Sequence, residues 1–216
     1  MQPAVRRFLF VVALCFTLLA QTGCSKRAQL DPGKINGTVY TNDFFKLQLN
    51  IPADWSVNGE LAKQQILHAG RDRMKIDNAK TEQAMDASVQ RTTQLLTLSR
   101  HPMAGGTPTS SFGCVSERLV PGVGIENGRD YLNAVVKTLQ YSTVPLAIED
   151  QSRTEKLGGA EFHVLSIAYQ TPRGKIPQTY YARTTNGYAL VFIVTVIDEA
   201  DKKTTDEILR SIKFGG

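Results

Sequence analysis

Cysteine and histidine, which supply many metal ligands and catalytic groups, are scarce in this chain. Its 216 residues include three cysteines and three histidines, and no histidine has another histidine or a cysteine within four residues. Zinc sites commonly combine such residues at short spacings, so no local metal motif is present. The G-x-S-x-G sequence of the α/β-hydrolases is also missing. We therefore expect no metal, no cofactor and no locally encoded catalytic site.

The chain also lacks a membrane-spanning apolar run and a strong excess of charge. The apolar run at residues 8–20 has 13 residues, whereas a helix needs ~20 to cross a bilayer. The net charge is +5, and the basic residues are dispersed among acidic ones. A nucleic-acid-binding domain usually gathers its basic residues on one face or stripe. No nucleic-acid partner is expected.

The N-terminus has the organisation of an export signal. Arg6 and Arg7 precede the apolar run, and the sequence AQTGCS follows it at residues 20–25. This sequence resembles the bacterial lipobox, in which small residues precede a cysteine that receives a diacylglyceryl thioether. Gln21 departs from the apolar residue usual there. We expect cleavage between Gly23 and Cys24 and lipidation of Cys24, which would anchor the exported protein to a bacterial membrane on its extracytoplasmic side, facing the periplasm where there is one. An ordinary secretory signal and an uncleaved N-terminal anchor are the alternatives.

The remaining sequence predicts a short tether and one domain. Residues 1–23 are assigned to the signal peptide, the polar residues 24–34 to a lipidated tether, and residues 35–216 to a single domain. Every second residue of 45–51 is apolar, which predicts a half-buried strand. Residues 188–197 are too apolar for a sheet with one wet face, so this strand should be central and covered on both sides. Asn186-Gly187 before it predicts a tight hairpin.

Three segments favour helix. Residues 60–90 are rich in good helix formers and are interrupted near Asp77-Asn78. A second helix should run over 128–141 behind an Asn127 cap, and a third near the C-terminus. Each of these last two has one apolar stripe, made of Leu132, Val135, Val136 and Leu139 in the first and of Thr205, Ile208, Leu209 and Ile212 in the second. The predicted fold is α+β, a mainly antiparallel sheet with helices on both faces.

Two segments resemble PsbP-like domains, the family of the photosystem II extrinsic subunit. Residues 40–55 read YTNDFFKLQLNIPADW, with the family's Y-x-N-x-x-F start, strand, proline turn and tryptophan. Residues 187–214 are similar to its closing strand and helix. The resemblance implies an α/β/α sandwich and a binding or assembly role. It assigns Phe44, Leu47, Ile51 and Trp55 to the core and Pro52 to a turn, and it carries over no functional residue.

The remaining candidate sites have structural interpretations. Gly122, Gly124 and Gly128 do not match a dinucleotide or phosphate-binding motif in spacing, so a connection with a helix cap is favoured. Cys114 is the only cysteine left after Cys15 is removed and Cys24 is acylated, and we expect it to be a buried structural residue. His163 is expected within a strand.

The sequence leaves three functions open. The favoured hypothesis is a membrane-anchored module that binds or assembles an envelope protein without chemistry. An envelope hydrolase with a site assembled by the fold and a carrier of a small apolar ligand are the alternatives. An apolar cavity would favour the carrier and a polar cleft with shifted pKa values the enzyme. A flat exposed apolar patch would favour the partner-binding module.

Overall fold

The computed structural model describes residues 30–102, 109–172 and 174–215, so Gly23 and Cys24 lie outside the described part. Two antiparallel sheets are formed. The larger has the strand order β4 (Ser56–Val57), β5 (Thr92–Ser99), β6 (Ser111–Arg118), β11 (Tyr188–Thr195), β10 (Gly174–Thr185), β9 (Ala160–Thr171), β7 (Leu146–Asp150), with β8 (Thr154–Leu157) also paired to β9. The smaller has the order β1 (Lys34–Asn36), β2 (Val39–Asn42), β3 (Leu47–Asn50), β12 (Lys213–Phe214).

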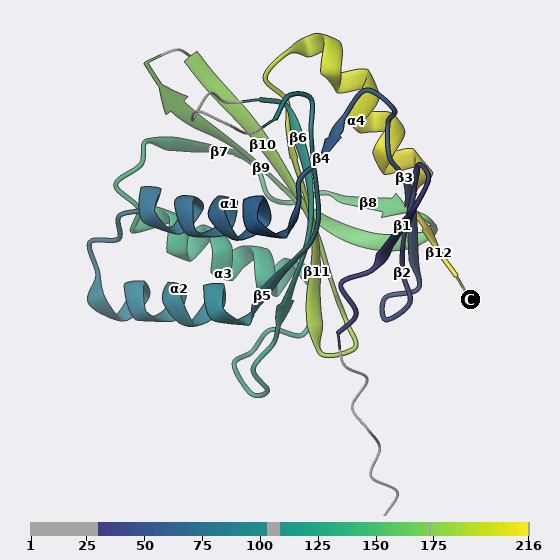
Figure 1. Cartoon of the computed structure of the whole chain (residues 1–216). Helices are drawn as coiled ribbons and strands as arrows, with labels where there is room; N and C mark the ends of the chain where they lie inside the picture. The colour runs from purple at the N-terminus through teal and green to yellow at the C-terminus, as the bar shows by residue number, and fades with distance from the viewer. Residues whose placement is uncertain (1–29, 103–108, 173, 216) are drawn as a thin grey trace, which may run out of the picture.

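In the described residues, four helices complete the fold, and they cover both faces of the larger sheet. The helices α1 (Glu60–Arg73), α2 (Ala79–Arg91) and α3 (Gly128–Gln140) lie over one face (Figure 1). The other face is covered by α4 (Glu199–Ser211) together with the small sheet (Figure 1). The predicted α+β fold, with helices on both faces, is thus confirmed. The small sheet is an additional cover that the sequence did not indicate.

Each face of the larger sheet has its own hydrophobic core. The core beneath the small sheet and α4 is rich in aromatic residues and includes Tyr40, Phe45, Trp55, Phe112, Phe162 and Phe192. The core beneath α3 is aliphatic and includes Val115, Leu132, Val136, Leu139, Leu165 and Ile167. Strand β11 contributes alternately to both cores, as its run of apolar residues predicted. Trp55 and Cys114 are buried in the first core, as predicted, whereas Phe44 only packs against its margin.

Turns and caps form where the sequence indicates them. Asn186 and Gly187 join β10 to β11 with φ angles of 53° and 79°, the left-handed backbone of a tight hairpin turn. The side chain of Asn127 accepts hydrogen bonds from Arg129 N and Asp130 N, and Asp130 bonds back to the Asn127 backbone. This capping box fixes the first residue of α3. In the described part of the chain, no helix is long and apolar enough to span a membrane.

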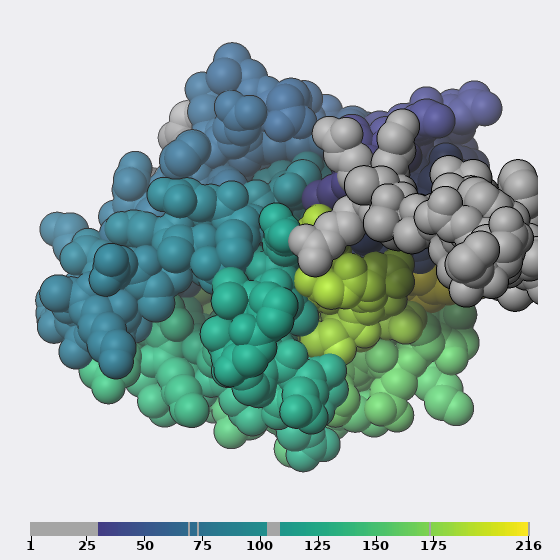
Figure 2. Space-filling model, turned by 90° about the horizontal axis from the view of Figure 1, so that it is seen from below, coloured from purple at the N-terminus to yellow at the C-terminus, as the bar shows by residue number. Residues whose placement is uncertain are grey.

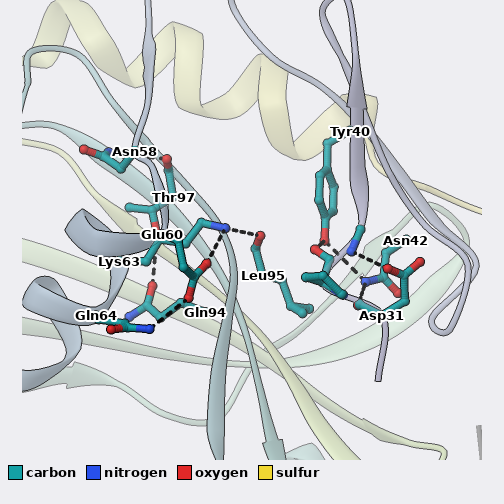
Figure 3. A network of polar contacts seen from close by, with 12 residues as sticks. Asp31, Tyr40, Asn42, Asn58, Glu60, Lys63, Gln64, Gln94, Leu95 and Thr97 are labelled. Atoms are coloured by element: carbon teal, nitrogen blue, oxygen red, sulfur yellow. Dashed lines mark hydrogen bonds and ion pairs between the residues drawn. The ribbon is translucent and has the colours of Figure 1, made fainter. Parts of the chain in front are cut away.

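A polar network closes the outer edge of β5, where the pairing with β6 shifts register between Gln94 and Leu96. The Lys63 ammonium of α1 donates to the Leu95 carbonyl over 2.9 Å and lies 3.7 Å from the Glu60 carboxylate (Figure 3). A carbonyl left without its partner at a bulge would be costly to bury. Lys63 satisfies it and so attaches α1 to this edge.

Candidate functional site

A cleft with a volume of about 1010 Å³ lies between α4 and the larger sheet. Its walls come from β8, from α4 and from the ends of β10 and β11 that lie farthest from the Asn186-Gly187 turn. Apolar side chains form its base, among them Leu157, Val194 and Leu209. Charged side chains line it above this base: Arg153, Glu155, Lys156, Glu199, Lys202, Asp206 and Arg210.

Polar contacts fix the first turn of α4 against the sheet. Arg100, just after β5, pairs with Asp201 in the helix over 3.4 Å and with Asp54 over 2.9 Å. The hydroxyl of Ser110 accepts hydrogen bonds from the backbone N–H groups of Ile197 and Asp198 over 3.0 and 3.3 Å. Because Ser110 and Asp201 are both buried, the contacts that these two residues make are partly shielded from competition with water, whereas the Arg100–Asp54 pair is exposed.

The other end of α4 is held by close backbone packing. Gly158, in the β8–β9 turn, has a φ of +56°, and a Cβ atom there would lie 2.8 Å from the Ile212 carbonyl oxygen. Only glycine therefore lets the turn approach the end of the helix. Beyond it, β12 pairs with β3 through Lys213 and Phe214. Held at both ends, α4 forms a fixed wall of the cleft.

The two long faces of α4 differ in their surroundings. Glu199, Lys202, Asp206 and Arg210 recur at helical spacing and line the cleft, whereas Lys203 and Glu207 lie outside it. The cleft side chains form local ion pairs, Lys202 with Glu199 over 3.4 Å and Arg210 with Asp206 over 3.7 Å. Exposed pairs of this kind contribute little to stability, so a ligand can exchange for either partner at small cost.

Tyr181, from β10, is the titratable group set deepest in the cleft, with 7% of its surface exposed. Burial, and secondarily the nearby Glu155 carboxylate, raise its pKa to about 12. The phenol is therefore neutral at physiological pH and can donate a hydrogen bond, but it is too weak an acid to ionise there. Arg153 lies close by, in ion pairs of 3.0 Å with Asp150 and Glu155. The arrangement offers hydrogen bonds and both signs of charge above an apolar base.

The histidines and the internal cysteine do not come together in this cleft. His68 is exposed on α1, His101 is exposed just after β5, and His163 lies half-buried in β9, the strand predicted for it. Cys114 is fully buried in β6, and burial raises the pKa of its thiol well above the ordinary value. Within the described ranges, no three His, Cys, Asp or Glu side chains form a group that could hold a metal ion.

The glycine-rich connection before α3 has a packing role at its last glycine. A Cβ atom at Gly128 would lie 2.0 Å from the Ala182 carbonyl oxygen, so the helix begins directly against the backbone of β10. Gly122 and Gly124 have φ angles of +81° and +76° and open space around them. Their loop borders a second hollow of about 410 Å³ beside the β10–β11 turn. The interpretation as a connection with a helix cap agrees with this geometry.

The cleft residues were not singled out from the sequence. The charged face of α4 follows the same helical spacing as any solvated helix face, and Tyr181 is one of seven tyrosines. The cleft is formed where distant segments come together, because Arg153 and Tyr181 line it with α4. This proximity exists only in the folded chain, so no local sequence signal could have identified it.

No protein-family model and no curated protein sequence matches the chain. Its fold is similar to the solution structure of cyanobacterial PsbP (CyanoP) from Synechocystis sp. PCC 6803, with a TM-score of 0.47, 9% identity, and coverage of 85% of this chain and 98% of that one. LpqN, involved in cell envelope biogenesis of Mycobacterium tuberculosis, has a TM-score of 0.42 and 13% identity, with 85% of each chain covered. A Bacteroides thetaiotaomicron VPI-5482 protein has a TM-score of 0.45 and 11% identity, over 84% of this chain and 50% of that one.

These likenesses concern the arrangement of strands and helices alone. The α+β arrangement itself is established by the strands and helices of this chain. A shared fold hosts many functions, so the role of this chain has to be argued from its own cleft.

Proposed function

We propose that this protein is an exported bacterial lipoprotein, anchored through a lipid on Cys24, that binds a segment of an envelope protein in the cleft beneath α4 without chemistry. The observation that carries the proposal is the placement of the cleft. The described chain begins at Leu30, at the same end of the molecule as the turn at Asn186-Gly187 (Figure 1). The cleft involves the opposite ends of β10 and β11. A lipid tether at one end would therefore leave the cleft accessible from the other.

The distance between the two ends supports this orientation. Gly187, in the turn just before β11, and Val194, in that strand, are seven residues apart, and a strand rises about 3.3 Å per residue, which places them roughly 20–25 Å apart. A surface at this distance from the tethered end clears the bilayer headgroups. A protein held in this way presents its cleft to the envelope space rather than to the lipid.

The chemistry of the cleft favours a peptide-like occupant. An extended segment of another protein offers amide groups to Tyr181, apolar side chains to Leu157 and Val194, and charges of either sign to the ion pairs of α4. A carrier of small apolar ligands would need a largely apolar cavity. The many charged residues around this cleft therefore favour a partner over an apolar cargo.

Two features support a role without catalysis. A general acid or base works best when its pKa lies near the working pH. Burial raises the pKa of Tyr181 to about 12, far above physiological pH. The thiol of Cys114 is buried in the core, where a substrate cannot reach it. We expect no turnover by the purified protein of ester, peptide, phosphoester or glycoside substrates. Turnover that is lost on changing Tyr181 to Phe would overturn this part of the proposal.

The anchor is tested by fatty-acid labelling in a bacterial host. The unchanged protein and a Cys15→Ala variant should incorporate labelled fatty acid equally, because Cys15 lies within the segment expected to be removed. Cys24→Ala should lose the label and leave the membrane fraction or stall as a precursor. Full labelling of the Cys24→Ala protein would contradict lipidation at this residue.

The cleft is tested by photo-crosslinking in intact cells. A photoreactive amino acid at position 179 replaces a residue that lines the cleft, and one at position 203 replaces a residue of α4 that lies outside it. We expect one discrete adduct at Thr179 and none of the same mass at Lys203, whose side chain is 84% exposed. The same adduct at both positions, or at Lys203 alone, would argue against the cleft as the binding surface.

A further inference from the structure

Three segments that are distant in the sequence meet at one end of the molecule. The Phe44 ring contacts that of Tyr188, with ring centroids 5.2 Å apart, and the Asn186 side chain donates to the Phe44 carbonyl over 3.1 Å. The loop at residues 119–126 joins them, because its first N–H, on Leu119, donates to the Gly187 carbonyl over 3.0 Å. Figure 1 places the loop, the β10–β11 turn and the start of the described chain at the same end, and Figure 2 shows the loop beside the turn.

The point at which the chain enters this end is fixed. The side chain of Asn42 donates to the Asp31 carbonyl over 2.6 Å, and the Tyr40 hydroxyl donates to the Pro32 carbonyl over 2.9 Å (Figure 3). Gly33, with a φ of +87°, leaves room for the tyrosine, since a Cβ atom there would lie 2.4 Å from its hydroxyl oxygen. Residues 31–33 are therefore bound to the small sheet rather than free to swing.

The loop at this end is apolar and exposed. No residue from Leu119 to Ile125 carries a charge. Within it, Val120 is 43% and Val123 is 56% exposed, two of the eight large exposed hydrophobic side chains among the described residues. Positive φ angles at Gly122 and Gly124 turn the backbone on either side of Val123. Single exposed apolar residues are common. An uncharged turn that presents two of them beside the start of the described chain indicates an interaction surface.

The length of chain between the anchor and the fold limits what this surface can contact. Only six residue steps lead from Cys24 to Leu30, and a chain extends at most about 3.5 Å per residue, so the two are no more than ~20 Å apart. The steps include Lys26 and Arg27 and no acidic residue, a composition that anionic lipid headgroups attract. On the proposed function, this end of the fold is thus held against the bilayer.

We propose that the loop at residues 119–125 is a second membrane contact, which inserts Val120 and Val123 at the boundary between headgroups and acyl chains. The two acyl chains of a diacylglyceryl group suffice for stable anchoring, so the loop is not needed for attachment. It sets the orientation of the domain, because the lipid and the loop together define which end faces the bilayer. This inference rests on the lipid anchor at Cys24 but not on any occupant of the cleft.

Tryptophan fluorescence tests the contact in the full-length lipidated protein. Trp55 is the only tryptophan, so Trp55→Phe gives a silent background. In that background, Val123→Trp is compared with Ile197→Trp, which replaces a 42% exposed residue just past the far end of β11. The proteins are reconstituted in phosphatidylethanolamine–phosphatidylglycerol vesicles, with or without bromine on the acyl chains. Val123→Trp should shift its emission to the blue and be quenched by bromine, whereas Ile197→Trp should do neither.

A second probe keeps Trp55, so that the test does not depend on whether the Trp55→Phe protein folds. The variant Val123→Cys, with Trp55 kept, is labelled with an environment-sensitive thiol dye, because Cys24 is acylated and Cys114 is buried. Its emission should rise on vesicle binding, and a dye at Ile197→Cys should not respond. Equal responses at the two positions, or none at Val123, in protein that carries labelled fatty acid would overturn the loop contact and leave the anchor intact. Absence of fatty acid from Cys24 would overturn both.

Discussion

The change Gly128→Ala tests how α3 packs against β10. It has two effects of opposite sign on the free energy of unfolding. Alanine is the better helix former by about 1 kcal/mol, so propensity alone predicts a stabilised protein. The added Cβ atom would lie 2.0 Å from the Ala182 carbonyl oxygen and 2.7 Å from its carbonyl carbon. Both atoms belong to backbone in the middle of the larger sheet, so they cannot turn aside. The helix and the strand must separate by about 1 Å or more.

We expect the clash to outweigh the propensity. Overpacking usually costs about 1–3 kcal/mol, and a contact with rigid backbone belongs at the upper end, near 3 kcal/mol. For a chain of this size, 1 kcal/mol changes the melting temperature by about 2–4 °C, so Gly128→Ala should lower it by about 6–12 °C. The control is Gly70→Ala in α1, where a Cβ atom meets nothing within 4 Å. It should be neutral or stabilising, by up to about 1 kcal/mol.

Thermal and urea unfolding of the purified proteins measure both variants. A Gly128→Ala protein as stable as the wild type would refute the close approach of α3 to β10. The glycine would then be needed only for the flexibility of its loop. A loss of stability in Gly70→Ala as large as in Gly128→Ala would show that the effect is not specific to the contact.

Three further predictions concern buried groups. Trp55→Ala should cost about 3–5 kcal/mol, the range for emptying a large aromatic site, whereas Trp55→Phe should cost less, because the indole N–H has no hydrogen-bond partner to lose; equal losses in urea unfolding would contradict this. Cys114 in the native protein should react with a thiol reagent far more slowly than a peptide thiol, and equal rates would show that it is accessible. Unfolded tyrosine ionises near pH 10, while burial raises the pKa of Tyr181 to about 12 and that of Tyr40 above its ordinary value. The part of the stability that comes from these neutral buried phenols should therefore be lost as the pH rises from 10 to 12, and a Tyr181→Phe protein that loses stability as steeply as the wild type over this range would refute it.

Local sequence signals predicted the elements that depend on few residues. The Asn186-Gly187 turn requires positive φ at two neighbouring positions, which this pair provides, and β10 and β11 form around it. The break between α1 and α2 coincides with Asn78, whose side chain accepts a hydrogen bond from Thr81 N. Asn127 caps α3 in the same way. In each case one or two side chains determine the backbone, so the neighbouring sequence is sufficient.

The small sheet and the cleft could not be predicted from local sequence signals. Strand β12 has two residues and forms only because it reaches Leu47 and Gln48 of β3, far away in the chain. Strand β1 has three exposed residues and no apolar alternation, so its pairing with β2 is its only signature. The cleft combines β8, β10, β11 and α4, and the approach of the helix to Gly158 depends on a contact with Ile212. Such features arise from the packing of distant segments, which periodicity does not encode.

Reversing one charge on either face of α4 tests whether the cleft beneath this helix is the binding surface of an anchored protein. Lys202→Glu changes a residue that lines the cleft, and Lys203→Glu makes the same change on its neighbour outside it. The measurement is the yield of the adduct formed in intact cells by a photoreactive residue at position 179, at equal protein levels. We expect a clear loss with Lys202→Glu and an unchanged yield with Lys203→Glu. An equal yield in both variants, or a loss only with Lys203→Glu, would contradict this expectation.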